Sequence, residues 1–293
     1  MKLRLFLATG LLLPIASGGL ELRVSPKGDD RAAGTADAPL ASLEGARLAV
    51  RRLPRPLAGP VDVVFAEGTY RITQAAVFDG ADSGEAGKRV TYRAAPGAQV
   101  VISGGCELPP FEPGRDGRWT LHAPREAGVF EQLWIGDRRA TRARASNPGT
   151  RFIRSLESEK ALPPGSAEAG FTEQALRVSP EELKAFRDAS KEETTDAVVT
   201  FRHKWDSSRS RVASVDPTAG LLVIRGPGQK PNTAFDHLTG IVIENLPGLL
   251  DESGEWFLSG GGRLSYLPRP GENIAVARGV FPVAEKLLTL SGT

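Results

Sequence analysis

The stretch VDVVFAEGTYRI, residues 61–72, is the main basis for predicting the fold of this chain of 293 residues. Residues 61–65 are rich in β-branched and aromatic side chains, as expected for a strand that is largely buried. Glu67-Gly68 is typical of a turn, and residues 69–72 begin a second short strand. The stretch therefore predicts two short strands that meet at a glycine corner.

Similar short strands follow along the chain, separated by Gly, Asp and Pro. From Val63 to Val90 the chain advances 27 residues, and from Val77 to Val101 it advances 24. Strands that recur at such a period are typical of a solenoid, because one turn alone cannot bury its apolar side chains. We therefore expect the segments near these four valines to stack as successive turns of a spiral. The further strands are predicted at residues 76–78, 90–92 and 100–102.

An amphipathic helix precedes the first of these strands. Leu43, Ala46, Val50 and Leu53 recur at helical spacing and form one apolar stripe. Ser42 is the expected N-cap, and the helix should end before Pro54. We expect its apolar side to close the open end of the spiral, because an uncovered end would leave strand edges exposed. The charged residues of its opposite face are Glu44, Arg47, Arg51 and Arg52.

The regular pattern ends after Gly105, and residues 106–280 are predicted to form an inserted antiparallel β-subdomain. Gly136-Asp137 is a two-residue turn that predicts a hairpin between residues 132–135 and 138–142. Residues 260–262, three glycines, predict a second hairpin between residues 256–258 and 264–267. The other strands are expected at residues 119–122, 197–201, 211–215 and 221–225.

Residues 148–195 interrupt this subdomain with a polar composition. Ser179-Pro180-Glu181-Glu182 predicts a capping box and the start of one helix, which continues through Leu183 and Phe186. We expect this excursion to lie on the surface. A final strand is predicted at residues 287–290, and residues 281–293 are expected to begin further turns of the spiral that the chain does not complete.

The first 18 residues are typical of a secretory signal peptide. Lys2 and Arg4 precede an apolar run over residues 5–15, and small residues follow at 16–18. A helix of this run would be about 16 Å long, too short for a hydrocarbon core of about 30 Å. We therefore expect a secreted or periplasmic protein without a membrane partner.

Charge and cysteine content exclude several classes of function. The chain has 37 basic and 35 acidic residues, and cleavage of the leader removes Lys2 and Arg4, so the mature charge is 35 − 35 = 0. No nucleic-acid partner is indicated, since such binding needs a concentrated positive face. Cys106 is the only cysteine, so an internal disulfide is impossible, and we expect it to be a small buried hydrophobe. The arginine cluster of Arg138, Arg139, Arg142 and Arg144 is interpreted as the solvated face of a hairpin.

Several short motifs of the chain lie at residues 24–29, 34–35, 39–43, 68–70, 92–97, 143–147, 244–251 and 254–257. Together they resemble secreted right-handed parallel β-helix proteins of the pectin-lyase-like kind. Over most of the chain they are similar to the N-terminal part of glycoside hydrolase families 120 and 141, which act on xylan- or fucose-containing glycans. The resemblance implies an all-β fold with a cap helix and the first coils over residues 19–105, followed by the inserted subdomain. Ser265 departs from the family pattern, which usually has an aromatic residue there.

The resemblance implies an exported glycoside hydrolase that acts on a polysaccharide or oligosaccharide. In those families the catalytic carboxylates lie on later coils, so no catalytic residue is assigned here and this chain alone is expected to be inactive. A non-catalytic carbohydrate-binding or structural β-helix module remains an alternative, as does a polysaccharide lyase. The glycan, the stereochemical outcome and the oligomeric state stay open. The carboxylates of Asp251, Glu252 and Glu255, with Glu244 nearby, are interpreted as turn residues that bond backbone amides.

Binding residues are predicted in the loop at residues 203–209. Trp205 offers a flat ring that can stack on a sugar, and His203 and Arg209 add hydrogen-bond donors. The three histidines are isolated in sequence, and neither HxxxH nor CxxC occurs, so no metal site is predicted. Neither GxGxxG nor GxxxxGK[ST] occurs, so no nucleotide cofactor is indicated.

Overall fold

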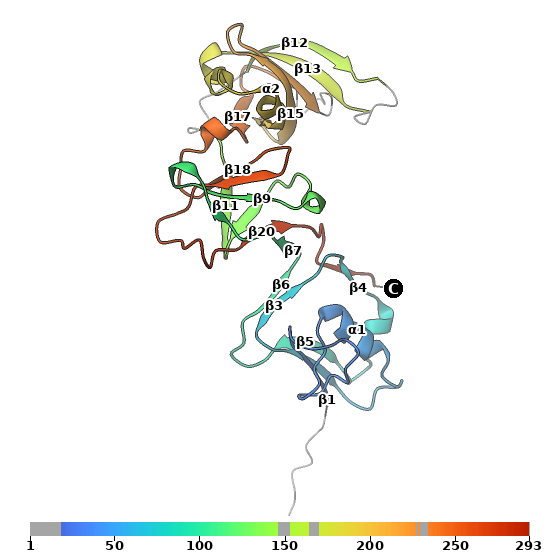
Figure 1. Cartoon of the computed structure of the whole chain (residues 1–293). Helices are drawn as coiled ribbons and strands as arrows, with labels where there is room; N and C mark the ends of the chain where they lie inside the picture. The colour runs from blue at the N-terminus through green and yellow to red at the C-terminus, as the bar shows by residue number, and fades with distance from the viewer. Residues whose placement is uncertain (1–18, 146–152, 164–169, 227, 229–233, 293) are drawn as a thin grey trace, which may run out of the picture. The chain divides into compact units, whose positions relative to one another are not determined.

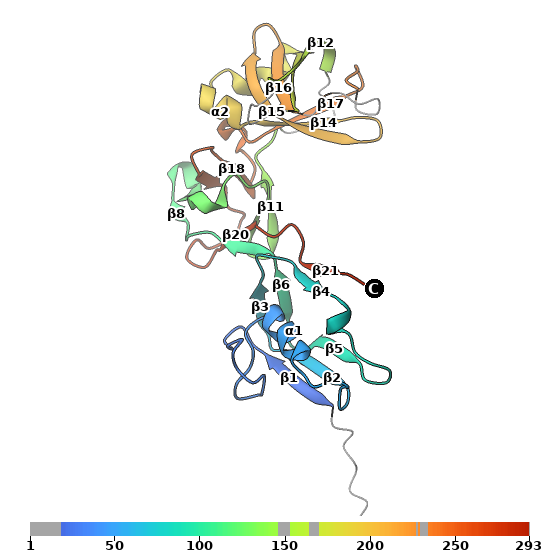
Figure 2. The same cartoon turned by 90° about the vertical axis from the view of Figure 1, so that its right-hand side faces the viewer.

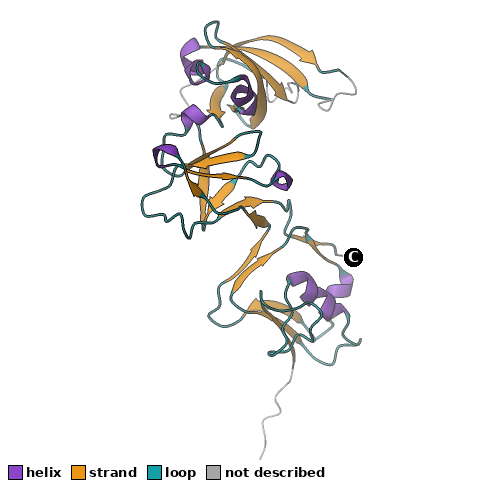
Figure 3. Ribbon diagram, viewed as in Figure 1, coloured by secondary structure: helices purple, strands orange, loops and turns teal. Residues whose placement is uncertain are grey.

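The computed structural model describes residues 19–145, 153–163, 170–226, 228 and 234–292. Strands predominate and helices are few and short (Figure 3), so the chain is mainly β. It divides into two compact units, one formed by the residues up to Gly105 with those from Val283 onward, and the other by Cys106–Pro282. The predicted signal peptide, residues 1–18, lies outside the described residues.

The first unit contains three parallel ladders (Figures 1 and 2). In the largest ladder, Leu20 of β1 aligns with Val61 of β2, which in turn aligns with Val90 of β5. The other two ladders have two strands each, β3 with β6 and β4 with β21. The strands are β1 (Leu20–Val24), β2 (Val61–Phe65), β3 (Gly68–Arg71), β4 (Ala76–Phe78), β5 (Val90–Ala94), β6 (Val100–Ser103) and β21 (Leu288–Leu290).

The predicted stacking of four valine segments is right for one pair and wrong for the other. β2 and β5 do pair in parallel, and Val63 is fully buried. Val77 and Val101 belong to two different ladders and are 46% and 52% exposed. The physical reason is that β2, β3 and β4 follow one another in the chain but belong to three different ladders, so β3 pairs with β6 and β4 pairs with β21.

The helix α1 (Leu43–Arg51) forms as predicted and covers the core of the first unit. The hydroxyl of Ser42 accepts a hydrogen bond from the amide of Gly45 at 2.9 Å, which confirms the N-cap. Ala46 and Val50 are fully buried and share one apolar cluster with Leu22 and Val24 of β1. Burial of this stripe holds a nine-residue helix that would be marginal alone.

Two arginines of the charged face of α1, Arg47 and Arg51, pair with one buried carboxylate, whereas Glu44 and Arg52 are exposed. The carboxylate of Asp82, at the end of the short 3₁₀ turn η1 (Gly80–Asp82), accepts from Nε and Nη2 of Arg51 at 2.6 Å each. Arg47 donates to the same carboxylate at 3.3 Å and is only 8% exposed. The sequence pattern could not indicate this burial, since Asp82 lies 31 residues beyond Arg51.

The second unit begins with an eight-stranded mixed sheet in the order β7-β20-β10-β11-β18-β19-β9-β8. Both predicted hairpins are present: β10 pairs antiparallel with β11, and β18 with β19. β11 pairs in parallel with β18, so the sheet is not purely antiparallel. Its strands are β7 (Gly105–Glu107), β8 (Glu112–Pro113), β9 (Trp119–His122), β10 (Leu133–Ile135), β11 (Arg138–Arg142), β18 (Glu255–Leu258), β19 (Arg263–Tyr266) and β20 (Gly279–Pro282).

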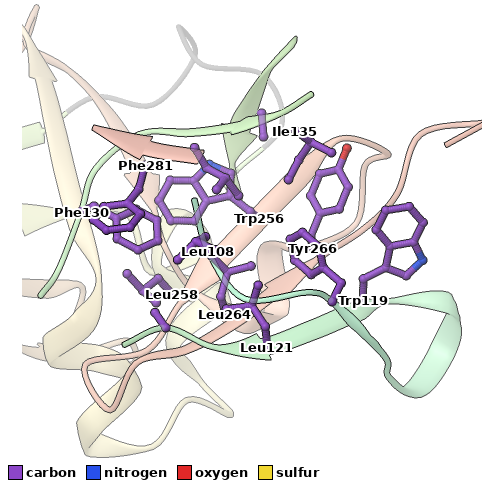
Figure 4. Close-up of a cluster of buried hydrophobic side chains, with 14 residues drawn as sticks. Leu108, Trp119, Leu121, Phe130, Ile135, Trp256, Leu258, Leu264, Tyr266 and Phe281 are labelled. Carbon is purple, nitrogen blue, oxygen red and sulfur yellow. The ribbon is translucent and has the colours of Figure 1, made fainter. Parts of the chain in front are cut away.

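One face of this sheet carries an aromatic core, shown in Figure 4. The rings of Phe130 and Trp256 stack with centroids 5.5 Å apart, and Phe130 stacks on Phe281 at 5.0 Å. Trp119 and Tyr266 lie at the other end of the cluster, 5.8 Å apart. Cys106 is partly buried and packs against this cluster as a small apolar side chain.

The second unit also contains a six-stranded antiparallel sheet in the order β12-β13-β16-β15-β14-β17. Two of its strands, β12 (Ile153–Ala161) and β13 (Thr172–Val178), fall in the region predicted to be a surface excursion. That prediction is wrong, because Leu183 and Phe186 are buried in the core of this sheet. The remaining strands are β14 (Val198–Arg202), β15 (Ser207–Asp216), β16 (Leu221–Gly226) and β17 (Gly240–Glu244).

The capping box predicted at residues 179–182 lies elsewhere. Pro180–Phe186 is a 3₁₀ helix, η4, and the side chain of Ser179 makes no capping hydrogen bond. The capping box is instead at Ser190 and Glu193, which open the short helix α2 (Lys191–Asp196). Both segments have the S-x-x-E pattern, and the second of them forms the two reciprocal hydrogen bonds of a capping box.

Candidate functional site

The hairpin of β14 and β15 presents a tryptophan at its tip. The amide of His203 donates to the carbonyl of Asp206 at 2.8 Å, and the Asp206 carboxylate accepts from the amide of Ser207 at 2.7 Å. Both strands lie inside the six-stranded sheet with partners on each side, so the base of the turn is firmly held. Trp205 is 90% exposed. The flat indole ring is therefore free to stack on a ligand such as a sugar.

The side chain of His203 stabilises this turn. Its Nε2 lies 2.9 Å from the hydroxyl of Ser208, and its ring packs against Phe201 and Phe235. Its Nδ1 is buried without a hydrogen-bond partner in the described part of the chain. His203 is therefore placed to stiffen the turn that carries Trp205 rather than to face a ligand itself.

Arg209 is the third residue predicted to bind substrate, and it lies on β15 beyond the turn. Its Nη1 lies 2.5 Å from the carboxylate of Glu131, and its Nη2 lies 3.1 Å from that of Glu244. The hydroxyl of Thr200 also donates to Glu244, at 3.1 Å. The structure thus separates the predicted group: Trp205 occupies the tip of the hairpin, and Arg209 lies in a polar cavity.

This cavity has a volume of about 380 Å³ and an unusually charged wall. Three arginines of the predicted cluster, Arg139, Arg142 and Arg144, line it, whereas Arg138 does not. The interpretation of the cluster as a solvated hairpin face is therefore wrong for Arg142, which is buried, whereas Arg139 and Arg144 are exposed. The remaining lining residues are Glu131, Ala140, Thr141, Thr200, Arg209 and Glu244.

The cavity is positioned where the two sheets of the second unit are joined. The amide of Ala145 donates to the carbonyl of Ile243 at 3.1 Å, and the amide of Asn245 donates to the carbonyl of Ala143 at 2.8 Å. Asn245 is 3% exposed, and its side-chain amide donates to the Leu258 carbonyl at 2.9 Å and accepts from the Leu258 amide at 3.1 Å. Its φ of 62° is left-handed, a conformation that asparagine tolerates better than most residues.

Arg142 is the buried member of the cationic wall. It is 7% exposed, its Nη2 donates to the carbonyl of Phe130 at 2.8 Å, and its guanidinium lies 5.0 Å from the ring centre of Trp256. Its Nε is buried with no hydrogen-bond partner among the described residues. Burial, followed by the nearby charge of Arg209, lowers the pKa of Arg142 to about 10.

Comparison with known proteins shows which solved structures have a similar fold. No family model and no curated protein matches the chain. A solved structure named as a glycoside hydrolase aligns with 94% of this chain at a TM-score of 0.77 and 22% sequence identity. The chain has a glycoside hydrolase-like fold. It spans about half of that enzyme, 48% of its length. A second structure, "The complex structure of XylC with xylose", aligns at a TM-score of only 0.31 and 16% identity and carries no weight.

Glycoside hydrolases use two carboxyl groups, one on each side of the bond that is cleaved. In the cavity, Glu131 and Glu244 are the lining carboxylates, and the guanidinium of Arg209 spans them. The space that a glycosidic bond would need between the two carboxylates is therefore filled by a cation. Both lining carboxylates are thus paired with the same cation.

The acidic cluster at residues 251–255 is built into a turn. The carboxylate of Glu255 accepts from the amides of Asp251 and Glu252 at 3.2 Å each, and from the amide of Arg144 at 3.3 Å. Glu255 is 3% exposed, and burial raises its pKa above the usual range. Its role is to hold the chain next to the cavity.

Across the described ranges, no three His, Cys, Asp or Glu side chains gather closely enough to hold a metal ion. None of the helices in the described part of the chain combines the length and the apolar character needed to cross a bilayer.

Proposed function

We propose that this chain is the N-terminal portion of an exported glycoside hydrolase that acts on a polysaccharide, and that its own contribution is to bind the glycan. The observation that carries the proposal is Trp205, 90% exposed at the tip of a firmly held hairpin. A flat ring of this kind stacks on the apolar face of a pyranose, while the indole N–H tolerates a wet site. The fold shared with a glycoside hydrolase supports this direction.

In this proposal the three parallel ladders are the first coils of a right-handed parallel β-helix, with α1 as the cap at one end. Exposure supports this direction of growth. The inward residues of β2 are buried, with Val61 at 2% and Val63 at 0%, whereas Leu288 and Leu290 of β21 are 48% and 73% exposed. Leu290 aligns with Phe78, and Phe78 packs on the core of the first unit. The side of the ladder that carries Leu290 is therefore apolar, and the described residues leave it exposed. Further coils would bury it.

The catalytic carboxylates are proposed to lie in the half of the parent protein that this chain does not span. The share of the similar enzyme that the chain covers, 48%, supports this division. The unit Cys106–Pro282 would be the inserted subdomain, and Trp205 and the charged cavity would contact the glycan. We expect no hydrolysis of chromogenic xylosides or fucosides by this chain alone, and clear turnover would contradict this division.

A non-catalytic glycan-binding module is the second candidate. It is favoured by the way Arg209 occupies the space between Glu131 and Glu244. A longer chain that continues beyond Thr293 separates the two candidates, because only the first predicts that glycosidase activity appears with the added residues.

The binding role is tested by Trp205→Ala. Retention on soluble xylan and other plant polysaccharides in affinity electrophoresis should weaken about tenfold, since aromatic packing contributes about 1.5 kcal/mol. Phe171→Ala is a matched control, because Phe171 is also an exposed aromatic residue of the six-stranded sheet region, at 42%. Its retention should stay unchanged. Equal retention of wild type and Trp205→Ala on every glycan that binds would refute the role of Trp205.

A further inference from the structure

The wall of the cavity carries more positive than negative charge. Its four arginines and two glutamates give a formal charge of 4 − 2 = +2. Arg209 is the arginine whose charge is matched, because it pairs with both glutamates. Arg139, Arg142 and Arg144 have no carboxylate within ion-pair distance among the described residues. An anion bound in the cavity would balance the positive charge of these unpaired guanidinium groups.

Arg142 is the strongest sign that the cavity is a binding site. A buried cation ordinarily has a carboxylate partner, since desolvation of an isolated charge is costly. Arg142 is 7% exposed and has one neutral acceptor, the carbonyl of Phe130, together with the face of Trp256. Its Nε is buried without a partner in the described chain. Burial and the neighbouring Arg209 also lower its pKa, which means that its charged form is under-compensated.

The rest of the wall suits a hydroxyl-rich molecule. Thr141 and Thr200 contribute hydroxyl groups, and Glu131 and Glu244 contribute carboxylate oxygens that accept from sugar hydroxyls. The volume of about 380 Å³ is within the usual range of small-ligand sites, about 300–1,000 Å³. Arg144 is exposed at the mouth and can meet a ligand without rearrangement of the core.

We infer that this cavity binds an anionic sugar unit, whose carboxylate or sulfate group meets the guanidinium groups of Arg142 and Arg144. The inference rests on the proposed function for the sugar part of the ligand, and on the charge of the cavity for the anionic part. It narrows the substrate class from any polysaccharide to one that carries acidic units.

The test is isothermal titration of the full chain with four probes: sodium D-glucuronate, glucose 6-sulfate, D-glucose and sodium acetate. An anionic sugar should bind about tenfold or more tightly than glucose, because a charge-assisted hydrogen bond adds to each contact. Comparison of glucuronate with the sulfate identifies which anion the site prefers. Raising NaCl from about 50 to 300 mM should weaken the binding, since charge attraction is screened.

Variants locate the binding in the cavity. Arg144 is exposed, so the variant Arg144→Gln should fold normally. Its affinity for the anionic sugar should be about fivefold or more lower than that of wild type. Arg142→Lys keeps the charge but loses the planar guanidinium, and it should weaken binding further. Arg138→Gln is the matched control, because Arg138 lies on the same strand and outside the cavity wall, so its affinity should equal that of wild type.

The inference is overturned if the anionic sugars bind no more tightly than glucose, if acetate binds as well as glucuronate, or if Arg144→Gln and Arg142→Lys both bind like wild type. Trp205→Ala separates this inference from the proposed function. Glucuronate binding that persists while Trp205→Ala leaves polysaccharide retention unchanged would remove the role of Trp205 and keep the anion site. Retention that depends on Trp205, with no preference for acidic sugars, would do the reverse.

Discussion

Replacing Asp82 with asparagine should destabilise the first unit far more than the same change at an exposed aspartate of that unit. The Asp82 side chain is 2% exposed, and its carboxylate accepts three kinds of hydrogen bond. Arg51 donates twice at 2.6 Å, Arg47 donates at 3.3 Å, and the amide of Asp79 donates at 2.8 Å. Asparagine keeps the shape but removes the charge, so Arg47, 8% exposed, loses its buried counter-ion.

The size of the effect follows from the pKa of Asp82. Hydrogen bonds from Arg51, with the charges of Arg47 and Arg51 and the Asp79 amide, lower this pKa from its usual 3.8 to about 2. The difference corresponds to about 2 kcal/mol of stability at pH 7. The side chain of Asp82 is 2% exposed, whereas solvent reaches Arg51, whose side chain is 29% exposed, so the pKa of Asp82 sets the size of the effect. Arg47 keeps its hydrogen bonds to Glu44 but loses the buried carboxylate, which adds to this, so we expect a total loss of about 3 kcal/mol.

The pH dependence has a definite sign. Because the folded pKa lies below the unfolded one, the stabilisation is fully present above pH 3.8 and is lost as the pH falls toward 2. At pH 3 about half of the charge-dependent part, about 1 kcal/mol, should be gone. The difference between wild type and Asp82→Asn should therefore narrow from pH 7 to pH 3.

Hydrogen exchange measured by mass spectrometry is the suitable assay. All four tryptophans, Trp119, Trp134, Trp205 and Trp256, lie in the other unit, so tryptophan fluorescence would not report on this one. Peptides that cover α1 report its opening free energy directly. Asp37→Asn, an exposed aspartate of the same unit, should change it by less than about 0.5 kcal/mol. A loss below about 1 kcal/mol in Asp82→Asn, or an equal difference at both pH values, would refute the reasoning.

Two further predictions concern the second unit, where tryptophan fluorescence does report unfolding in denaturant. Asn245→Ala should lower the free energy of unfolding by about 3 kcal/mol, since it leaves both backbone groups of Leu258 unpaired and puts alanine at φ 62°. Asn245→Gly should cost about 1 kcal/mol less, and equal losses in the two variants would show that the backbone strain is negligible. Ser190→Ala should cost about 1 kcal/mol because it removes a capping bond, whereas Ser179→Ala should be nearly neutral; the opposite order would show that the capping box is at residues 179–182 after all.

The predictions that succeed depend on residues close together in sequence. Ser42 and the apolar stripe of α1 specify a helix start and one buried face within three turns of chain. The turn at Gly136-Asp137 specifies the β10–β11 hairpin, and Gly136 adopts the positive φ of 58° that favours glycine. Local chemistry of this kind is readable because the interacting groups are only a few residues apart.

The predictions that fail depend on which distant segments meet. Val77 and Val101 look like Val63 in composition, but their partners are in other ladders, and no local signal assigns a strand to a ladder. Residues 153–161 and 172–178 are too polar to be recognised as sheet, yet they pair with each other, and β13 also pairs with β16. Sheet pairing overrides composition when a neighbouring strand supplies the hydrogen bonds.

The candidate site shows the same division. The sequence pattern is enough to predict that Trp205 lies in a short polar loop between strands, and it shows four arginines within residues 138–144. Folding then buries Arg142, brings Arg209 to Glu131 across 78 residues of sequence, and places Arg144 in one cavity with Glu244. Burial and charge pairing are properties of groups brought together by folding, so a linear pattern fixes the side chains available but not which of them become each other's surroundings.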